Sequence, residues 1–520
     1  MNKSRTTYSF INIFVGIGGY ILNALLGFIC RWFFVRTLPV EYLGINGLLS
    51  NVLYMLSLAE LGIGTAIVFA LYKPLAENDT EKIAALMQFY GKAYRIIGFA
   101  VAGIGVALIP FLGFIVGDTS GIKENFYLIY GIYLFNTCLT YFFSYRSSLF
   151  VAAQRNYVQQ GLSYAITIGQ SFFQIIYLLV FREYLGYLII QSIGTFLFNI
   201  IISIWAKKDY PYIVKKDIKP LDREEKRNLF KNIKALTISK VAGMFVNGTD
   251  NIIITYFDGL ITVGAASNYT LLSGTIASIT NLMFGGLTAS VGNLNAIENE
   301  EKKYSFFKIL QLANFFVYGW ATIGIVFVSS DMVRFLFGEN YVLPESIPFV
   351  LALNFYLVTM QSSVEMYKST LGLFKYGQFI LIFTAIINTI FSIILGNIWG
   401  LFGIYLATAI ARISTNAWYI PYAIFKHGLK KSPLEYFKSY FKYLFIILII
   451  GGLCYLICVN LHFPIWLNVI LKILICSIVF VSIFCVVFHK SNEFQYLKKK
   501  MLELCVKIFK KLPCFLRTDK

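Results

Sequence analysis

The sequence is poor in charged residues and in the residues on which enzyme active sites depend. Only 14% of its 520 residues are charged and only three are histidine, while 58% are hydrophobic. The mean hydropathy of +0.69 excludes an ordinary soluble domain. No histidine lies inside an apolar stretch, which excludes a nucleophile–histidine pair at membrane depth. We therefore expect a protein that is not an enzyme.

The eight cysteines lack the spacing of a metal or redox site. No two of them form a Cys-x-x-Cys pair, and most lie in or beside apolar stretches, where a thiol packs as a small apolar group. The motif Gly16-x-Gly18-Gly19 is no nucleotide-binding loop, because it lies within an apolar stretch rather than after a strand. We expect no cofactor, no metal site and no catalytic residue.

Long apolar segments are what the sequence has in abundance. About fourteen of them approach or exceed 20 residues, enough for an α-helix to cross a bilayer, which predicts an all-α integral membrane protein. The expected spans are 10–36, 44–72, 86–116, 126–149, 157–181, 186–205, 235–257, 261–290, 305–329, 346–368, 377–396, 400–425, 442–460 and 464–488.

Lysine and arginine decide the orientation of these spans. When the spans alternate in direction, 37 of the 45 lysines and arginines fall in loops on the side of the N-terminus, and four fall on the other side. Short cytoplasmic loops are enriched in these residues, so both termini are expected in the cytoplasm. The net charge of +19 then reflects topology rather than a nucleic-acid partner. No signal-peptidase motif follows the first span, which we expect to be retained.

A weak internal repeat predicts two lobes. The longest polar break, 206–234, carries ten basic residues and divides the first twelve spans into six and six. The acidic-then-basic loop at 75–82 recurs at 296–303, and the offset of about 220 residues also relates Gly44 to Gly264. Both copies have the same orientation, so the repeat is parallel, an arrangement in which transporters bind substrate between the halves. Chance similarity of two short loops is the alternative.

The expected domains follow from the repeat. They are an N-terminal six-helix lobe at 1–205, a basic cytoplasmic linker at 206–234, a C-terminal six-helix lobe at 235–425, an extra helix pair at 426–489 and a tail at 490–520. The two lobes would surround a central cavity. The tail alternates an apolar stripe with lysines, so we expect it to lie on anionic lipid at the inner membrane surface.

The first span carries a stripe of small and polar residues. They recur every three or four positions and share one face of a helix: Asn12, Gly16, Gly19, Asn23, Gly27 and Arg31. A charged side chain inside a membrane is costly and normally faces a cavity or a partner. We interpret Asn23 and Arg31 as lining a wet, cationic cavity. The alternative is that the glycines serve close helix packing and that Arg31 reaches the outer interface.

Other basic residues within spans extend this hypothesis. Lys240 and Arg412 are further candidates for the cavity wall, where cations would attract anions and phosphates in particular. Under the repeat offset, Asn251 falls opposite Arg31. Lys240 lies near a span end and has snorkelling as its alternative role, whereas Lys472 lies outside the repeat and is left out of the cavity.

Three carboxylates are candidates for coupling to an ion gradient or for ion pairing. Glu60 lies near the middle of its span, where a carboxylate must be paired, protonated or in contact with water. Asp250 lies on a polar face of the seventh span, and Glu365 lies near the inner end of the tenth, where snorkelling is the alternative.

Three stretches near the N-terminus carry a family resemblance. They are the opening from Asn12-Ile13-Phe14 through Arg31-Trp32-Phe33-Phe34, the connector at 38–48, and 59–66 with the loop at 78–82. These stretches resemble polysaccharide flippases of the Wzx type, in a superfamily that includes MATE multidrug exporters and the lipid II flippase. The resemblance is strongest over residues 10–95. It implies two six-helix lobes around a cavity and two additional C-terminal helices.

The resemblance also implies a function. The expected substrate is an undecaprenyl-pyrophosphate-linked oligosaccharide, moved from the inner to the outer leaflet of a bacterial cytoplasmic membrane by alternating access, for capsule, exopolysaccharide or O-antigen synthesis. The expected partners are membrane lipids, a polysaccharide polymerase and a chain-length regulator. Arginines in the first helix of related flippases are associated with a cationic lumen, and Arg31 is the matching candidate. Lys240 and Arg412 rest on the burial argument alone.

Three other interpretations remain open. A MATE-like exporter of drugs or small solutes would share the fold. A membrane polymerase or ligase would need a sizeable outer loop, which this sequence lacks. A structural scaffold for glycan assembly would not depend on the charges within the spans.

Overall fold

The computed structural model is helical throughout the part of the chain that it describes. Described are residues 5–56, 63–113, 122–153, 155–215, 220–227, 229–230, 233, 237, 248–285, 287–373, 376–461, 463–500 and 502–503. They form two compact units. The first comprises Met1–Leu282, Leu336–Leu343 and Gln378–Ala411, and the second comprises Met283–Phe335, Pro344–Gly377 and Arg412–Lys520. The lobe boundaries expected from the sequence stay a prediction.

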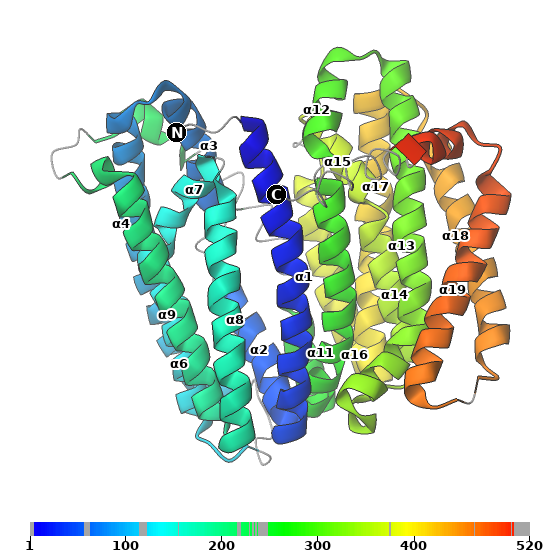
Figure 1. Ribbon diagram of the computed structural model, residues 1–520, viewed down its shortest axis with the longest axis horizontal. Helices are drawn as coiled ribbons and strands as arrows, with labels where there is room; N and C mark the ends of the chain where they lie inside the picture. The colour runs from blue at the N-terminus through cyan, green and yellow to red at the C-terminus, as the bar shows by residue number, and fades with distance from the viewer. Residues whose placement is uncertain are drawn as a thin grey trace, which may run out of the picture. The chain divides into compact units, whose positions relative to one another are not determined.

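The first unit contains most of the N-terminal helices (Figure 1). Its elements are α1 (Arg5–Thr37), α2 (Glu41–Leu56), α3 (Ile63–Glu77), α4 (Thr80–Ala107), η2 (Ile109–Phe111), α6 (Phe126–Phe143), η3 (Ser144–Ser147), α7 (Ser148–Ala152), α8 (Asn156–Val180), α9 (Tyr184–Asp209), η4 (Pro211–Val214), nearly all of α11 (Asp250–Gly285) and most of α16 (Gln378–Ser414).

The second unit contains the remaining helices. Its elements are α12 (Thr288–Ile297), most of α13 (Glu300–Phe337), α14 (Ser346–Thr359), α15 (Ser362–Thr370), α17 (Asn416–Ile424), η6 (Phe425–Leu429), α18 (Pro433–Cys458) and α19 (Ile465–Phe488). The short η5 (Glu339–Tyr341) belongs to the first unit.

Ten helical segments among the described residues are long and apolar enough to cross a membrane, so the chain is a multi-pass membrane protein. One of these segments, Phe379–Leu429, has 51 residues. At about 1.5 Å per residue a straight helix of that length would exceed twice the thickness of a bilayer core. The segment therefore contains more than one crossing, and the total of fourteen spans stays a prediction.

The chain reverses direction within α16, at Gly400, whose φ of 55° favours glycine. A Cβ on Gly403 would lie 2.0 Å from the carbonyl oxygen of Leu395, so the two arms of the hairpin touch through their backbones. Farther along, Asn388 Nδ2 donates to Thr408 Oγ1 at 2.9 Å. These contacts place the turn where the sequence predicts a break between two spans. A second break, at Gly259 (φ 78°) in α11, coincides with another predicted boundary.

A polar network holds the connector between α1 and α2. Tyr42 donates a hydrogen bond to Glu124 Oε2 and accepts one from the backbone N–H of Lys123 at 3.2 Å. The backbone N–H of Tyr184 donates to the other carboxylate oxygen of Glu124 at 3.4 Å. Burial, reinforced by the hydrogen bond to Glu124, raises the pKa of Tyr42 to about 12. The phenol therefore stays protonated and able to donate at physiological pH.

Aromatic side chains fill the interface between α13, α18 and α19 in the second unit. The rings of Phe315 and Tyr443 stack with their centroids 4.4 Å apart. The Cβ position of Gly319 lies 3.2 Å from the ring of Phe480, so a small residue lets α13 and α19 approach closely. This packing holds α18 and α19, which correspond to the two additional C-terminal spans predicted from the sequence, against α13.

A buried ion pair joins the same two helices. Lys472 Nζ of α19 lies 2.5 Å from Asp331 Oδ2 of α13, and the two side chains are 19% and 8% exposed. Arg334 Nη1 approaches the other oxygen of this carboxylate at 3.4 Å. Lys472, which the sequence analysis leaves outside the cavity, thus compensates a buried negative charge.

Replacing Lys472 with methionine is expected to destabilise the protein by about 3 kcal/mol, because Asp331 would remain buried with only Arg334 beside it. The melting temperature of the purified protein in detergent measures this effect. Adding Asp331→Asn to Lys472→Met should recover part of the loss. The control Lys302→Met breaks an exposed pair with Glu298 and should change little. An unchanged melting temperature in Lys472→Met would contradict a stabilising role for the pair.

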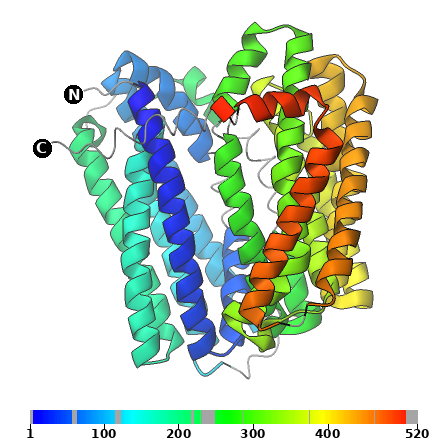
Figure 2. The ribbon, with the colours of Figure 1, turned by 45° about the vertical axis from the view of Figure 1, so that its right-hand side comes forward.

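A short helix at 492–500 follows α19 and turns away from its axis (Figure 2). Glu493 pairs with Lys308 of α13 at 3.2 Å, and the ring centroid of Phe494 lies 6.0 Å from that of Phe484. These contacts tie the start of the basic tail to the second unit. Most of the predicted amphipathic stripe lies beyond the described residues, so its position on the membrane surface stays a prediction.

Candidate functional site

Arg31 lies in the penultimate turn of α1 and reaches across to α11 within the first unit. Its Nε donates to Asn268 Oδ1 at 3.0 Å, and its Nη2 donates to Ser267 Oγ. Asn268 is fully buried, and Ser267 passes a hydrogen bond on to the carbonyl of Gly264 at 2.6 Å. The guanidinium is therefore held in place by neutral oxygen atoms.

No carboxylate compensates this guanidinium in the part of the chain that the structure describes. The ion pairs found there involve other cations, and the two hydrogen bonds of Arg31 engage two of its five N–H groups. Neutral oxygens replace part of the lost hydration but leave the positive charge in place. A half-buried, oriented guanidinium with donors to spare is an arrangement suited to a phosphate or another anion.

The polar stripe of α1 divides into two parts with different surroundings. Toward the N-terminus, the Cβ position of Gly16 lies 3.4 Å from Gln160 Oε1, and that of Gly19 lies 2.2 Å from the ring of Tyr164, both on α8. These glycines allow α1 and α8 to lie side by side (Figure 1). Close packing, the alternative role weighed in the sequence analysis, therefore applies to Gly16 and Gly19.

The second part of the stripe, from Asn23 to Arg31, is open at Gly27. Gly27 is exposed, and no side-chain or neighbouring backbone atom lies within 4 Å of its Cβ position. Asn23 is half-buried, and its Oδ1 is shielded from solvent without a hydrogen-bond partner among the described residues. The open space beside this part of α1 therefore lies at Gly27, while the lining role of Asn23 stays a prediction.

Contacts between α2 and α11 repeat with the offset that relates the two halves of the sequence. The Cβ position of Gly44 lies 2.1 Å from the carbonyl oxygen of Leu260. That of Gly264 lies 2.8 Å from the carbonyl oxygen of Val40. Adding 220 to Gly44 and Val40 gives Gly264 and Leu260, so the two contacts are reciprocal.

The contact of Arg31 follows the same rule. The residue 220 positions after Arg31 is Asn251, whose side chain donates to the carbonyl of Gly47 at 3.4 Å. The residue 220 positions after Gly47 is Ser267, to which Arg31 donates. Two reciprocal pairs of contacts thus follow the offset of 220 residues. Under that offset Arg31 and Asn251 take equivalent places with different charge, and the division into two repeated lobes stays a prediction.

Exposed polar positions continue along these helices. On α2, the exposed residues include Ser50 and Tyr54. Their counterparts 220 residues later, Thr270 and Gly274 on α11, are exposed too. Hydroxyl groups exposed within a membrane span face water more favourably than lipid. Thr270 lies one turn from Ser267, which contacts Arg31, so an exposed hydroxyl follows the Arg31 contact along α11.

The other predicted site residues are placed as follows. Asp250 is the first residue of α11 and is half-buried. Arg412 is half-buried in the last turn of α16 and belongs to the second unit. Glu365 of α15 is exposed and accepts a hydrogen bond from Lys368 at 3.1 Å, which agrees with a position at a span end.

Two of the predicted residues, Glu60 and Lys240, lie outside the described residues. Ser267 and Asn268, which hold Arg31, were not predicted from the sequence. The available signal was the run of small residues from Gly264 to Ser267, since close packing there brings two helices within hydrogen-bonding distance.

Comparison with known proteins gives the fold. No family model matches the chain. It is 22% identical over 484 residues to an uncharacterised membrane protein of Methanocaldococcus jannaschii, covering 89% of this chain and 92% of that protein. Among solved structures it is similar to the lipid II flippase MurJ in an inward-closed conformation, with a TM-score of 0.66, 15% identity and coverage of 91% of this chain and 98% of that chain.

Two transporters of the MOP superfamily show the same architecture. An inward-facing MATE multidrug transporter matches with a TM-score of 0.58 and 15% identity, over 75% of this chain and 91% of that chain. A transporter from Pyrococcus furiosus matches with a TM-score of 0.52 and 14% identity, over 82% and 96%. The chain is thus a multi-pass membrane protein with the fold that the lipid II flippase MurJ shares with the MATE transporters of the MOP superfamily.

Proposed function

We propose that the protein is a flippase that moves an undecaprenyl-pyrophosphate-linked oligosaccharide from the inner to the outer leaflet of a bacterial cytoplasmic membrane. The observation that carries this proposal is the oriented guanidinium of Arg31 on the open, polar part of α1, without a carboxylate partner among the described residues. The fold is that of a protein named as a lipid II flippase.

The chemistry of the site favours an anionic substrate. A pyrophosphate offers several acceptor oxygens to a guanidinium of which the described residues engage two of five N–H groups. An exporter of cations would meet repulsion at Arg31, which disfavours a cationic drug as the substrate. The hydroxyl groups of Ser50, Tyr54 and Thr270 supply hydrogen-bonding partners of the kind that sugars require.

Translocation needs no bond to form or break. The two lobes would alternate between inward-open and outward-open states, the pyrophosphate and sugars would pass along the polar surface, and the polyprenyl chain would stay in lipid. Lys240 and Arg412 would add positive charge to the pathway, and Asn23 would line it. Glu60 or Asp250 would couple the cycle to a proton or cation gradient, with Glu365 as a further candidate.

The setting of this activity is part of the proposal. Both termini would lie in the cytoplasm, and the product would pass to a polysaccharide polymerase and a chain-length regulator that build capsule, exopolysaccharide or O-antigen. The Wzx type of flippase is the family that the motifs near the N-terminus resemble.

A deletion strain tests the proposal directly. We expect polyprenyl-linked oligosaccharide to accumulate in the leaflet facing the cytoplasm and surface polysaccharide to be lost. The leaflet is identified by whether an added glycosidase or lectin reaches the oligosaccharide in inverted or in right-side-out membrane vesicles. Accumulation in the outer leaflet would contradict the proposal and indicate a later step such as polymerisation. Normal surface glycan with reduced efflux of a dye would instead support a small-solute exporter of the same fold.

A further inference from the structure

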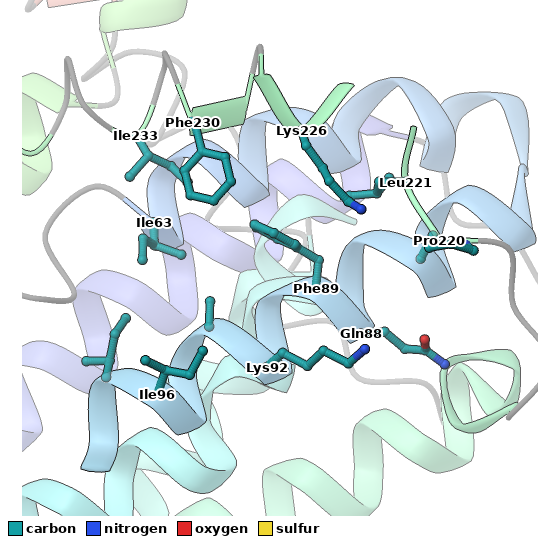
Figure 3. A pocket seen from close by; sticks show the side chains of 13 residues that line it. Ile63, Gln88, Phe89, Lys92, Ile96, Pro220, Leu221, Lys226, Phe230 and Ile233 are labelled. Carbon is teal, nitrogen blue, oxygen red and sulfur yellow. The ribbon is translucent and has the colours of Figure 1, made fainter. Parts of the chain in front are cut away.

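A pocket of about 520 Å³ lies between α4 and the linker, far from Arg31 in sequence and formed entirely within the first unit (Figure 3). Its volume falls in the range of small-molecule sites, about 300–1,000 Å³. Its walls are apolar apart from one glutamine and two lysines. The lining includes Phe89, Lys92, Ile96, Lys226 and Phe230.

The linker is fixed to α4 by specific contacts, so this pocket is a built feature. Lys82 forms an ion pair with Glu225, and Gln88 Nε2 donates to the carbonyl of Lys215 at 3.0 Å. The rings of Phe89 and Phe230 meet edge to face with their centroids 5.8 Å apart. Both polar and apolar contacts thus hold the two walls together.

Two lysines give the pocket its positive charge. Lys92 and Lys226 form no ion pair among the described residues, and no carboxylate lines the pocket. The linker carboxylate beside them, Glu225, is already paired with Lys82. Figure 3 shows the ammonium ends of Lys92 and Lys226 pointing toward the same end of the pocket, on either side of Phe89.

The opposite end of the pocket is apolar and continues onto a lipid-compatible surface. Ile63, Ile96, Phe230 and Ile233 lie there (Figure 3). Ile96 and Phe230 are 70% and 56% exposed. From Ile96, α4 continues through Phe99, 68% exposed, within a segment apolar enough to span a membrane. The site is therefore cationic at one end and apolar at the other.

We propose that this pocket binds an anionic phospholipid of the cytoplasmic leaflet. Lys92 and Lys226 would hold the phosphate group, and an acyl chain would lie along Ile96, Phe230 and the apolar face of α4. The proposal rests on the predicted orientation, which places the linker and the start of α4 on the cytoplasmic side. The proposed lipid site does not depend on the transported substrate, so its test is independent of the test of the flippase proposal.

Thermal stabilisation of the full-length protein in detergent tests this site. We expect dioleoyl-phosphatidylglycerol to raise the melting temperature more than dioleoyl-phosphatidylcholine at equal concentration. In the variant Lys92→Gln/Lys226→Gln the apparent affinity for phosphatidylglycerol should fall about 30-fold. The matched control Arg223→Gln/Arg227→Gln removes the same charge from exposed positions of the same linker segment and should keep the affinity.

Two further arms separate a lipid from a free anion. Dihexanoyl-phosphatidylglycerol should bind more weakly than the long-chain lipid, and Phe230→Ser should reduce that dependence on chain length. Inorganic phosphate alone should stabilise little. An equal effect of inorganic phosphate would overturn the lipid assignment, and so would an equal loss of affinity in the arginine control. Melting temperatures measured without lipid show whether each variant is folded.

Discussion

Arg31→Ala is expected to reduce translocation about 10- to 150-fold, because a hydrogen bond to a charged group contributes about 1.5–3 kcal/mol and each 1.4 kcal/mol corresponds to a factor of ten. The rate of transfer of a fluorescent polyprenyl-pyrophosphate-linked oligosaccharide across proteoliposome membranes measures the effect. The same change removes a cation that no described carboxylate compensates. It also leaves the buried Oδ1 of Asn268 without its donor, so we expect the melting temperature to fall modestly while transport falls far more.

Two variants make this prediction specific. Arg31→Lys keeps the charge but loses the planar fork, so it should recover transport only in part. Arg36→Ala removes a cation one to two turns away that is exposed and stacks on Trp32, with its guanidinium carbon 3.8 Å from the ring centroid. This control should transport normally. A normal rate in Arg31→Ala at normal expression would eliminate the role assigned to Arg31.

Gly44→Ala is expected to have the second large effect, on folding. The added Cβ would lie 2.1 Å from the carbonyl oxygen of Leu260, and a backbone atom cannot move aside as a side chain does. Overpacking costs about 1–3 kcal/mol or more, and the upper end applies here because α2 and α11 would have to separate. The melting temperature and the yield of monodisperse protein measure the loss.

The reciprocal contact provides a graded comparison. Gly264→Ala would place its Cβ 2.8 Å from the carbonyl oxygen of Val40, so it should be destabilising but less so than Gly44→Ala. Gly27→Ala meets no atom within 4 Å and gains helix propensity, so it should be neutral or stabilising. If all three substitutions had equal effects, the close approach of α2 and α11 would not be the cause.

Much of the architecture follows from local properties of the sequence. The lengths and hydropathy of the segments predict the helices and the membrane, and the breaks near Gly259 and Gly400 fall where the apolar runs are interrupted. The sequence suggests an offset of about 220 residues from two loops and two glycines. Contacts between α2 and α11 are related by the same offset, since adding 220 to the residues of one contact gives residues of the other. These features are predictable because transfer into a bilayer depends on consecutive residues, and a repeat is visible within one chain.

The uses of individual polar residues could not be predicted in this way. Gly16 and Gly27 belong to the same stripe, yet one packs against α8 and the other is open. The sequence placed Arg31 on a polar face without showing that Asn268 would hold it, 237 positions away. Periodicity assigns a residue to a face of its helix, but the neighbour of that face depends on how other helices pack.

The sequence by itself thus determined that this is a helical, multi-pass membrane protein with a basic polar segment at 206–234 and an arginine in its first long apolar stretch. Tertiary structure decided which charges are compensated. Lys472 meets Asp331 in a buried pair, Arg31 meets only neutral oxygens, and Lys92 and Lys226 share an apolar pocket. The physical reason is that the free energy of a charge within a membrane depends on atoms a few ångströms away, and those atoms come from distant parts of the chain.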